Sequence, residues 1–294
     1  MARYLHSDVL AERILLPCGR RVEITYSGDP AGKPLFFFHG FGASGLTIPP
    51  EEPILPVGGV QVIAVDRPGI GLSDPSPGRT LLDFPNDIAA LADALQIERF
   101  AVLGWSGGGP YALACAYTMP ERITAAGIVS SAPSFTDLEM RAYLSANWKQ
   151  MAMVAQVAPW LLRLLFGQIG RRIYRDPKQA LQKAVTEMAP ADQALVTDSR
   201  FRYLLMGGML AAYRHGGRGV ADDALVLMRP WGFRPEEIRP KIHLWHGEAD
   251  PTWPVGVGRY LAAKIPHCQA TFYPSEGHLT ILTHWADIVA TLTA

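Results

Sequence analysis

A five-residue stretch, 104–108 with the sequence G-W-S-G-G, constrains the fold more than any other part of the chain. It follows the apolar run 100–103 and precedes a segment, beginning near Gly109, that is predicted to be helical. The pattern Gly-x-Ser-x-Gly in this context is typical of a sharp, strained strand-to-helix turn with the serine at its apex. Glycine suits positions 104 and 108 because side chains there would collide where the strand and the helix pack closely. The start of the helix would direct its free N–H groups toward Ser106, where they can stabilise negative charge.

Length, charge and cysteine content narrow the class of protein. A chain of 294 residues can form one large domain or a core with an inserted subdomain. The formal net charge is zero, and we identify no basic or acidic block that would indicate a nucleic acid or an anionic membrane as partner. Three widely separated cysteines, Cys18, Cys115 and Cys268, argue against a disulfide framework.

The chain also shows no pattern of export or membrane insertion. The N-terminus lacks the charged and apolar regions of a secretory signal. The longest apolar stretch, 151–166, is too short and too interrupted to cross a bilayer. We therefore expect a cytoplasmic protein with a small-molecule substrate and without a nucleic-acid or membrane partner. These patterns do not predict the oligomeric state.

Short apolar runs alternate with helical segments over most of the chain. A hairpin is predicted for 13–16 and 21–26, and helices for 84–95, 111–117 and 284–292. Near-continuous apolar runs, typical of a parallel sheet covered on both faces, are found at 35–38, 60–65, 100–103, 126–129, 242–245 and 270–273. The strand signal disappears between about Pro133 and Pro240. The predicted fold is therefore a doubly wound, mostly parallel α/β core, residues 1–133 and 241–294, with an inserted helical cap, residues 134–240.

Several motifs together resemble those of the α/β-hydrolase family, on its serine-nucleophile branch. They are the H-G-F-G stretch at 39–42, the D-R-P-G-I-G-L-S stretch at 66–73, the turn at Ser106, and then Asp250 and His278. The order Ser, Asp, His matches the order of the catalytic triad in that family. The resemblance implies hydrolysis of an ester, thioester, amide or related bond beneath a cap. Relatives that use an aspartate nucleophile, the haloalkane dehalogenases and epoxide hydrolases, are disfavoured because this turn carries serine.

The residue types support the same chemistry from first principles. Ser106 is a weak nucleophile that needs a base, and His278, just past a predicted strand, is placed to be that base. Asp250, also just past a strand, would orient the imidazole, with Asp137 as its rival. The backbone N–H groups of Phe41 and Gly107 are the predicted oxyanion donors. This chemistry requires no cofactor and no metal.

Aromatic residues are the candidates for substrate binding. We assign this role to Trp105, beside the serine, and to Trp160 and Phe166 in the predicted cap, whose apolar surface exceeds what anchoring one helix face needs. The expected substrate is a small to medium, partly hydrophobic ester or related acyl compound. A carboxylesterase, a lactonase, a C–C bond hydrolase and a perhydrolase remain open alternatives.

Two other functions compete with hydrolysis. Residues 40–45 match the dinucleotide-binding pattern Gly-x-Gly-x-x-Gly, with Asp66 about twenty residues further on. However, a proline-rich stretch (Pro49, Pro50, Pro53 and Pro56) occupies the position of the helix that this motif requires, which disfavours an oxidoreductase. The second alternative is a non-catalytic ligand-binding protein on the same fold. A zinc site is not expected, since His243 and His246 point to opposite faces of a strand.

Overall fold

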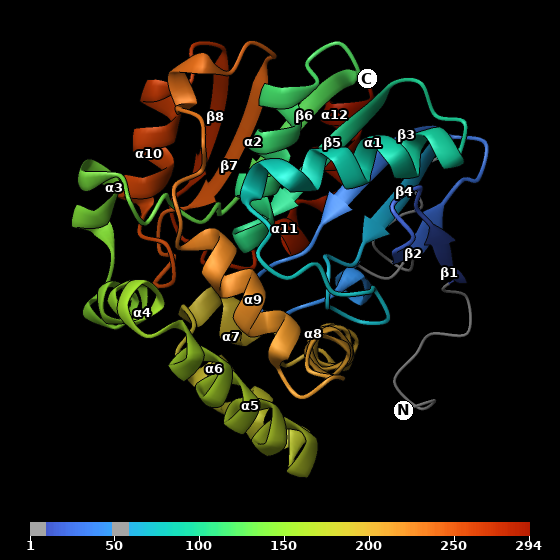
Figure 1. Cartoon of the computed structure of the whole chain (residues 1–294). Helices are drawn as coiled ribbons and strands as arrows, with labels where there is room; N and C mark the ends of the chain where they lie inside the picture. Colours follow the sequence, from blue (N-terminus) through green and yellow to red (C-terminus); the bar gives the residue numbers. More distant parts are fainter. Residues whose placement is uncertain (1–9, 49–58) are drawn as a thin grey trace.

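The computed structural model describes residues 10–48 and 59–294. Its centre is an eight-stranded sheet with the order β1-β2-β4-β3-β5-β6-β7-β8 (Figure 1). The strands are β1 (Leu10–Leu15), β2 (Arg21–Gly28), β3 (Lys33–Phe38), β4 (Val60–Val65), β5 (Phe100–Trp105), β6 (Ile123–Val129), β7 (Ile242–Gly247) and β8 (Cys268–Tyr273). All eight predicted strands are present, most of them extended by one to three residues.

Pairing in the sheet confirms the predicted fold class. Strands β3 to β8 run parallel to one another, with β3 between β4 and β5. The N-terminal hairpin adds β1 and β2 in antiparallel orientation at one edge. Because these strands are parallel, their carboxyl ends all lie on the same side of the molecule. Ligands of open α/β folds bind next to these strand ends.

Helices cover both faces of the sheet because both faces of its strands are apolar. Phe36 and Phe38 of β3 belong to one hydrophobic cluster and Leu35 and Phe37 to another, as the two-residue period of a strand requires. The first cluster includes residues of α1 (Phe84–Ala94), α2 (Gly109–Thr118) and α10 (Val255–Lys264). The second includes residues of α11 (Thr280–Thr283) and α12 (Trp285–Thr293). We did not predict α10 from the sequence.

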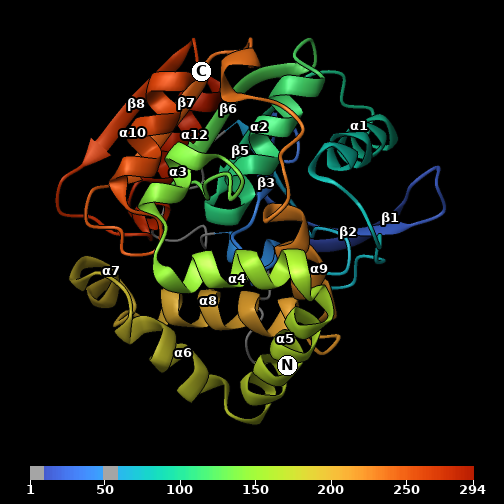
Figure 2. The same cartoon turned by 60° about the vertical axis from the view of Figure 1, so that its left-hand side comes forward.

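Between β6 and β7 the described residues form seven α-helices, one 3₁₀ turn (Pro235–Glu237) and no strand. We call α3 to α9 the helical insertion; in Figures 1 and 2, α4 to α8 gather on one side of the molecule, away from α1, α2 and α12. Its helices are α3 (Leu138–Tyr143), α4 (Ala146–Val157), α5 (Pro159–Arg175), α6 (Pro177–Thr186), α7 (Pro190–Leu195), α8 (Ser199–Ala212) and α9 (Arg218–Leu227). A third hydrophobic cluster joins it to loops of the core, including Phe135 and Trp253.

Candidate active site

Ser106 lies on a tight turn between β5 and α2 that depends on the glycines on either side of it. Its φ is 54°, a left-handed conformation that residues other than glycine rarely adopt. A Cβ atom on Gly104 would lie 2.3 Å from the carbonyl oxygen of Gly108, and one on Gly108 would lie 2.0 Å from that of Phe38. The two flanking glycines therefore have the steric role expected from the sequence. A 3₁₀ turn, Ser106–Gly108, leads directly into α2.

Two further side chains form a hydrogen-bonded chain with the serine. The Nε2 atom of His278 lies 2.8 Å from Oγ of Ser106, and its Nδ1 atom lies 2.7 Å from Oδ2 of Asp250. With the proton on Nδ1, the imidazole donates to Asp250 and accepts from the serine hydroxyl. The other carboxylate oxygen of Asp250 accepts from the backbone N–H groups of Thr252 and Trp253. Asp250 is thus both a turn residue and the partner of His278.

The surroundings of His278 favour its protonated form. Burial, the largest influence, opposes the charged imidazolium. The adjacent carboxylate of Asp250, its hydrogen bond and the charge of Asp192 outweigh burial and raise the pKa of His278 above its ordinary value. His246 contacts the turn formed by residues 250–253, since its Nε2 atom lies 2.8 Å from the carbonyl oxygen of Trp253. Burial lowers the pKa of His246, so that ring is neutral at pH 7.

Asp137, the alternative acid, lies elsewhere. Its side chain caps α3, accepting from the N–H of Met140 at 2.9 Å, as its position before that helix predicts. Its other oxygen accepts from the hydroxyl of Tyr260. The structure therefore places Asp250, and not Asp137, beside the histidine.

The two predicted oxyanion donors are neighbours in space. A Cβ atom on Gly107 would lie 2.8 Å from the backbone nitrogen of Phe41, so the two loops touch beside Ser106. Within the described part of the chain, neither N–H group has a hydrogen-bond acceptor. Two adjacent, unused N–H donors next to a nucleophile can stabilise an oxyanion.

A buried ionic network holds the loop that carries Phe41. Arg67 donates to the carbonyl oxygens of His39 and Gly40 and pairs with Asp223 of α9, 2.8 Å away. Burial and the charge of Arg67 keep the pKa of His39 well below its ordinary value, so His39 is a neutral structural residue. The loop is consequently tied both to the core and to the helical insertion.

Aromatic rings cover Ser106, which is only 5% exposed. The indole N–H of Trp253 donates to Oγ of Ser106 at 3.2 Å. The ring of Trp253 lies 4.7 Å from that of Trp148 of α4, tilted by 33°, and further rings continue this cluster. We call Phe41, Phe135, Trp148, Phe166 and Trp253 the aromatic cluster.

The three predicted substrate-binding residues differ in placement. The ring of Trp105 lies 5.6 Å from that of His278, and its N–H donates to the backbone carbonyl of His278. Phe166 belongs to the aromatic cluster, with its ring 5.5 Å from that of Phe41. Trp160 is 59% exposed and makes no ring contact with the cluster among the described residues. Its placement does not support the expected role in lining the site.

Sequence reasoning missed Trp253 and Asp192. Trp253 follows Asp250 by three residues, and only the turn at Asp250 brings its indole to the serine. Asp192 of α7 contacts the backbone of His278 from 86 residues away in the chain. No spacing pattern links either residue to the serine, so the sequence carried no signal for them.

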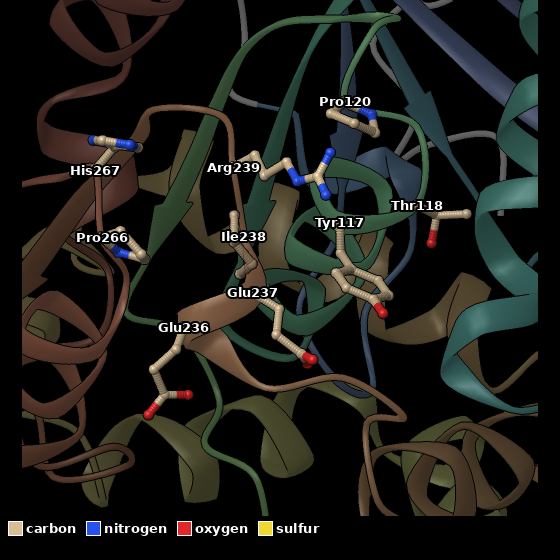
Figure 3. A pocket seen from close by; sticks show the side chains of 9 residues that line it. All are labelled: Tyr117, Thr118, Pro120, Glu236, Glu237, Ile238, Arg239, Pro266 and His267. Carbon is tan, nitrogen blue, oxygen red and sulfur yellow. The ribbon is translucent and has the colours of Figure 1, made fainter.

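A separate open groove lies at the other end of the strands, next to the residues where β7 and β8 begin. Its volume is ≈ 670 Å³, and Figure 3 shows its mixed lining of acidic, basic and apolar side chains. Glu236, one of these residues, already pairs with Lys264. None of the site residues described above lines this groove.

The described geometry supports neither a metal site nor a dinucleotide-binding helix. No group of three metal-binding side chains occurs within residues 10–48 and 59–294. After Gly40 the described chain forms a 3₁₀ turn, Gly45–Thr47, and no α-helix begins at the glycines of the dinucleotide pattern. The four prolines cited against that pattern lie outside the described residues. In the same described part, no helix combines the length and apolar character needed to span a bilayer.

Comparison with known proteins agrees with this architecture. The model of the alpha/beta hydrolase fold family matches residues 33–284. The chain belongs to this family. It is accordingly an enzyme of the α/β-hydrolase type.

Individual α/β-hydrolase relatives are distant but cover nearly the whole chain. A pimeloyl-[acyl-carrier protein] methyl ester esterase from Legionella pneumophila is 24% identical over 89% of this chain and 93% of its own length. A hydrolase from Pseudomonas aeruginosa superposes with a TM-score of 0.70 and 18% identity, covering 98% of this chain and 99% of that one. An esterase from Rhodococcus gives a TM-score of 0.70 with 20% identity, covering 96% and 98%.

Proposed function

We propose that this α/β-hydrolase is a serine esterase that acts on a small to medium, partly hydrophobic ester, with Ser106 as nucleophile, His278 as base and Asp250 as orienting acid. The observation that supports it best is the position of His278, whose two ring nitrogens face the serine hydroxyl and the buried carboxylate at hydrogen-bond distance. This is the geometry of an activated serine.

Each residue then has one task in the reaction. His278 Nε2 takes the proton from Ser106 as Oγ attacks the substrate carbonyl carbon. The N–H groups of Phe41 and Gly107 stabilise the negative oxygen of the tetrahedral intermediate. The imidazolium, stabilised by Asp250, returns the proton to the leaving alcohol, and an acyl-enzyme remains. Water, deprotonated by the same histidine, attacks the acyl carbon and releases the acid and the free serine.

The aromatic cluster supports a hydrophobic substrate. Its rings come from loops and from α4 and α5, and they form one apolar cluster that contacts Ser106 through Trp253. Pockets for small molecules are mostly apolar with a few oriented polar groups. We assign residues 134–240 the role of a cap over a core formed by 1–133 and 241–294. This reaction needs no cofactor, and the cytoplasmic location remains a prediction.

The test uses a fluorophosphonate probe and p-nitrophenyl esters. The wild-type enzyme should be labelled once, at Ser106, and should hydrolyse p-nitrophenyl butyrate. Ser106→Ala should lose both properties and keep the melting temperature of the wild type, because the hydroxyl is the reacting group. If the folded wild-type protein is not labelled, the non-catalytic ligand-binding alternative is favoured. If Ser106→Ala keeps more than a few per cent of the wild-type hydrolysis rate, Ser106 is not the nucleophile.

A narrower candidate is a methyl ester on an acyl chain attached to a carrier protein, the substrate named for the Legionella relative. One observation favours it, and it corrects our expectation that the chain has no basic block. Residues 146–183 contain one acidic residue and seven basic ones: Lys149, Arg163, Arg171, Arg172, Arg175, Lys178 and Lys183. Exposed apolar side chains accompany them on α4 and α5, namely Met153, Val157, Trp160 and Leu164. Such a surface suits an acidic protein.

Charge reversal tests this candidate. Arg171→Glu combined with Arg172→Glu should reduce kcat/KM for a carrier-borne methyl ester by on the order of tenfold through weaker electrostatic association. Hydrolysis of p-nitrophenyl butyrate by the same variant should not change, because both residues are exposed on α5. Equal rates for the carrier-borne ester in the variant and the wild type would exclude docking at this surface.

A further inference from the structure

Asp192 is a buried carboxylate of the helical insertion that contacts the loop carrying His278. It lies on α7 and is 1% exposed. Its Oδ2 atom accepts from the backbone N–H of His278 at 2.7 Å, and its Oδ1 atom accepts from that of Leu279 at 3.0 Å. Both oxygens therefore hold the peptide that carries the base.

The loop is shaped to admit this carboxylate. A Cβ atom on Gly277 would lie 2.2 Å from Oδ2 of Asp192 and 2.6 Å from Cβ of Ala189. The missing side chain at position 277 thus lets α7 approach the backbone beside His278. Two elements that are far apart in sequence meet here through a close fit and two charge-assisted hydrogen bonds.

We propose that Asp192 is a positioning residue through which the helical insertion fixes the backbone of His278 and places a negative charge beside it. This inference rests on the proposed esterase function. The two N–H donors fix the backbone from which the imidazole extends toward Ser106 and Asp250. The negative charge also lies near the ring and favours its protonated form.

The charged groups around His278 come from several elements. Those placed there among the described residues are Asp250 in the loop after β7, His246 on β7, Asp192 on α7, and the pair Glu276 and His284, 2.6 Å apart. Burial outweighs the N–H groups of Leu279 and His278, so the pKa of Asp192 is raised above its ordinary value. Because both of its oxygens accept hydrogen bonds, we take Asp192 as ionised when the enzyme is active.

The experiment compares Asp192→Asn with the wild type on p-nitrophenyl butyrate across pH. The asparagine keeps the size of the side chain but removes the charge and one acceptor. We expect kcat to fall on the order of tenfold, since small displacements of a catalytic group are costly. The acid limb of kcat/KM should also move to lower pH, because the loss of a nearby negative charge lowers the pKa of His278. A merely structural residue would not move that limb.

Two further variants complete the design. Asp222→Asn removes another carboxylate of the insertion, which pairs with Arg163 at 2.9 Å, and should leave the acid limb in place. Asp192→Glu keeps the charge but adds a methylene group, so turnover should fall while the acid limb stays near that of the wild type. This variant decides the question if Asp192→Asn does not fold, and wild-type turnover in Asp192→Glu would then refute the inference.

The outcomes separate this inference from the proposed function. Folded wild-type protein that neither hydrolyses the ester nor reacts with the fluorophosphonate would refute the esterase proposal itself. Wild-type protein that does both, together with an Asp192→Asn variant of unchanged turnover and unchanged acid limb, would refute only the role of Asp192. A fall in kcat without a shift of the limb is the result expected of a merely structural residue and would also refute the inference.

Discussion

At the scale of single residues, the chemistry of this protein depends on which carboxylate His278 contacts. Asp250 is buried, and one of its oxygens is 2.7 Å from Nδ1 of the histidine. Asp137 is engaged by the N–H of Met140 and the hydroxyl of Tyr260. The two aspartates therefore differ in what their replacement removes.

Replacing these two aspartates by asparagine should give very different rates. Loss of the orienting carboxylate in a serine triad lowers turnover by about ten-thousand-fold in the best-studied case. We expect Asp250→Asn to cost at least about a hundredfold in kcat on p-nitrophenyl butyrate, and Asp137→Asn to cost less than about tenfold, with a small loss of stability from the weakened helix cap. The reverse ranking, measured at saturating ester, would make Asp137 the acid.

The pH dependence of the rate should report His278. The base must be neutral to accept a proton, so activity falls as the pH drops through the pKa of His278. Because Asp250 and Asp192 raise that pKa despite burial, the midpoint of kcat/KM should lie above the ordinary value of about 6.5. Profiles with an uncharged ester measure this midpoint. A rate that is flat from mildly acidic to mildly basic pH would exclude histidine as the base.

At the scale of elements, α5 presents two different surfaces. Phe166 is buried on the face that meets Phe41, whereas Trp160 and Leu164 are exposed on the face toward solvent. Only the first face reaches the aromatic cluster. One amphipathic helix therefore packs against the aromatic cluster with one face and forms an outer surface with the other.

Phe166→Ala should change the preference for ester chain length. Removal of the ring opens space beside Phe41, so kcat/KM for p-nitrophenyl octanoate relative to the acetate should rise several-fold, at a cost of about 3–5 kcal/mol in stability. Trp160→Ala is the matched control on the same helix and should leave this ratio unchanged. The two-surface interpretation of α5 is wrong if both variants shift this ratio equally. It is also wrong if Phe166→Ala lowers kcat/KM by the same factor for esters of every chain length.

At the scale of the whole molecule, one buried ion network joins the helical insertion to the core. Asp223 of α9 pairs with Arg67 and Arg79 and accepts from the hydroxyl of Tyr111. Burial opposes its charge, but the two guanidinium groups outweigh burial and lower the pKa of Asp223 to about 2. The carboxylate is therefore ionised in the folded protein over the whole physiological range.

Asp223→Asn should destabilise the protein strongly at neutral pH. It leaves two buried arginines without a counter-charge, which costs about 3–5 kcal/mol in the free energy of unfolding. Because the folded-state pKa lies below the unfolded value, this stabilisation is present above pH of about 4 and is lost as pH falls toward about 2. Urea unfolding at several pH values measures the difference. Asp222→Asn, whose partner Arg163 is half exposed, should cost less than about 1 kcal/mol.

The amino-acid sequence by itself determined the strands of the sheet and the turn that carries Ser106, the candidate nucleophile. A hairpin pattern predicted β1 and β2, and near-continuous apolar runs predicted β3 to β8, as is typical of a parallel sheet covered on both faces. The turn at Ser106 was equally readable, since only glycine fits at 104 and 108 where backbone meets backbone. Such signals lie within a few residues of one another in the chain.

Only the tertiary structure decided which distant residues meet. The sequence favoured Asp250 but left Asp137 as a rival, and the packing of the loops placed Asp250 beside His278. The indole of Trp253 on the serine and the carboxylate of Asp192 on the loop of His278 depend on how the loops and the helical insertion pack, and the sequence did not predict them. The same packing separated Phe166 from Trp160, which the sequence alone had assigned the same role. These contacts join segments far apart in the chain, and no local propensity or periodicity encodes the partner of a side chain at such separations.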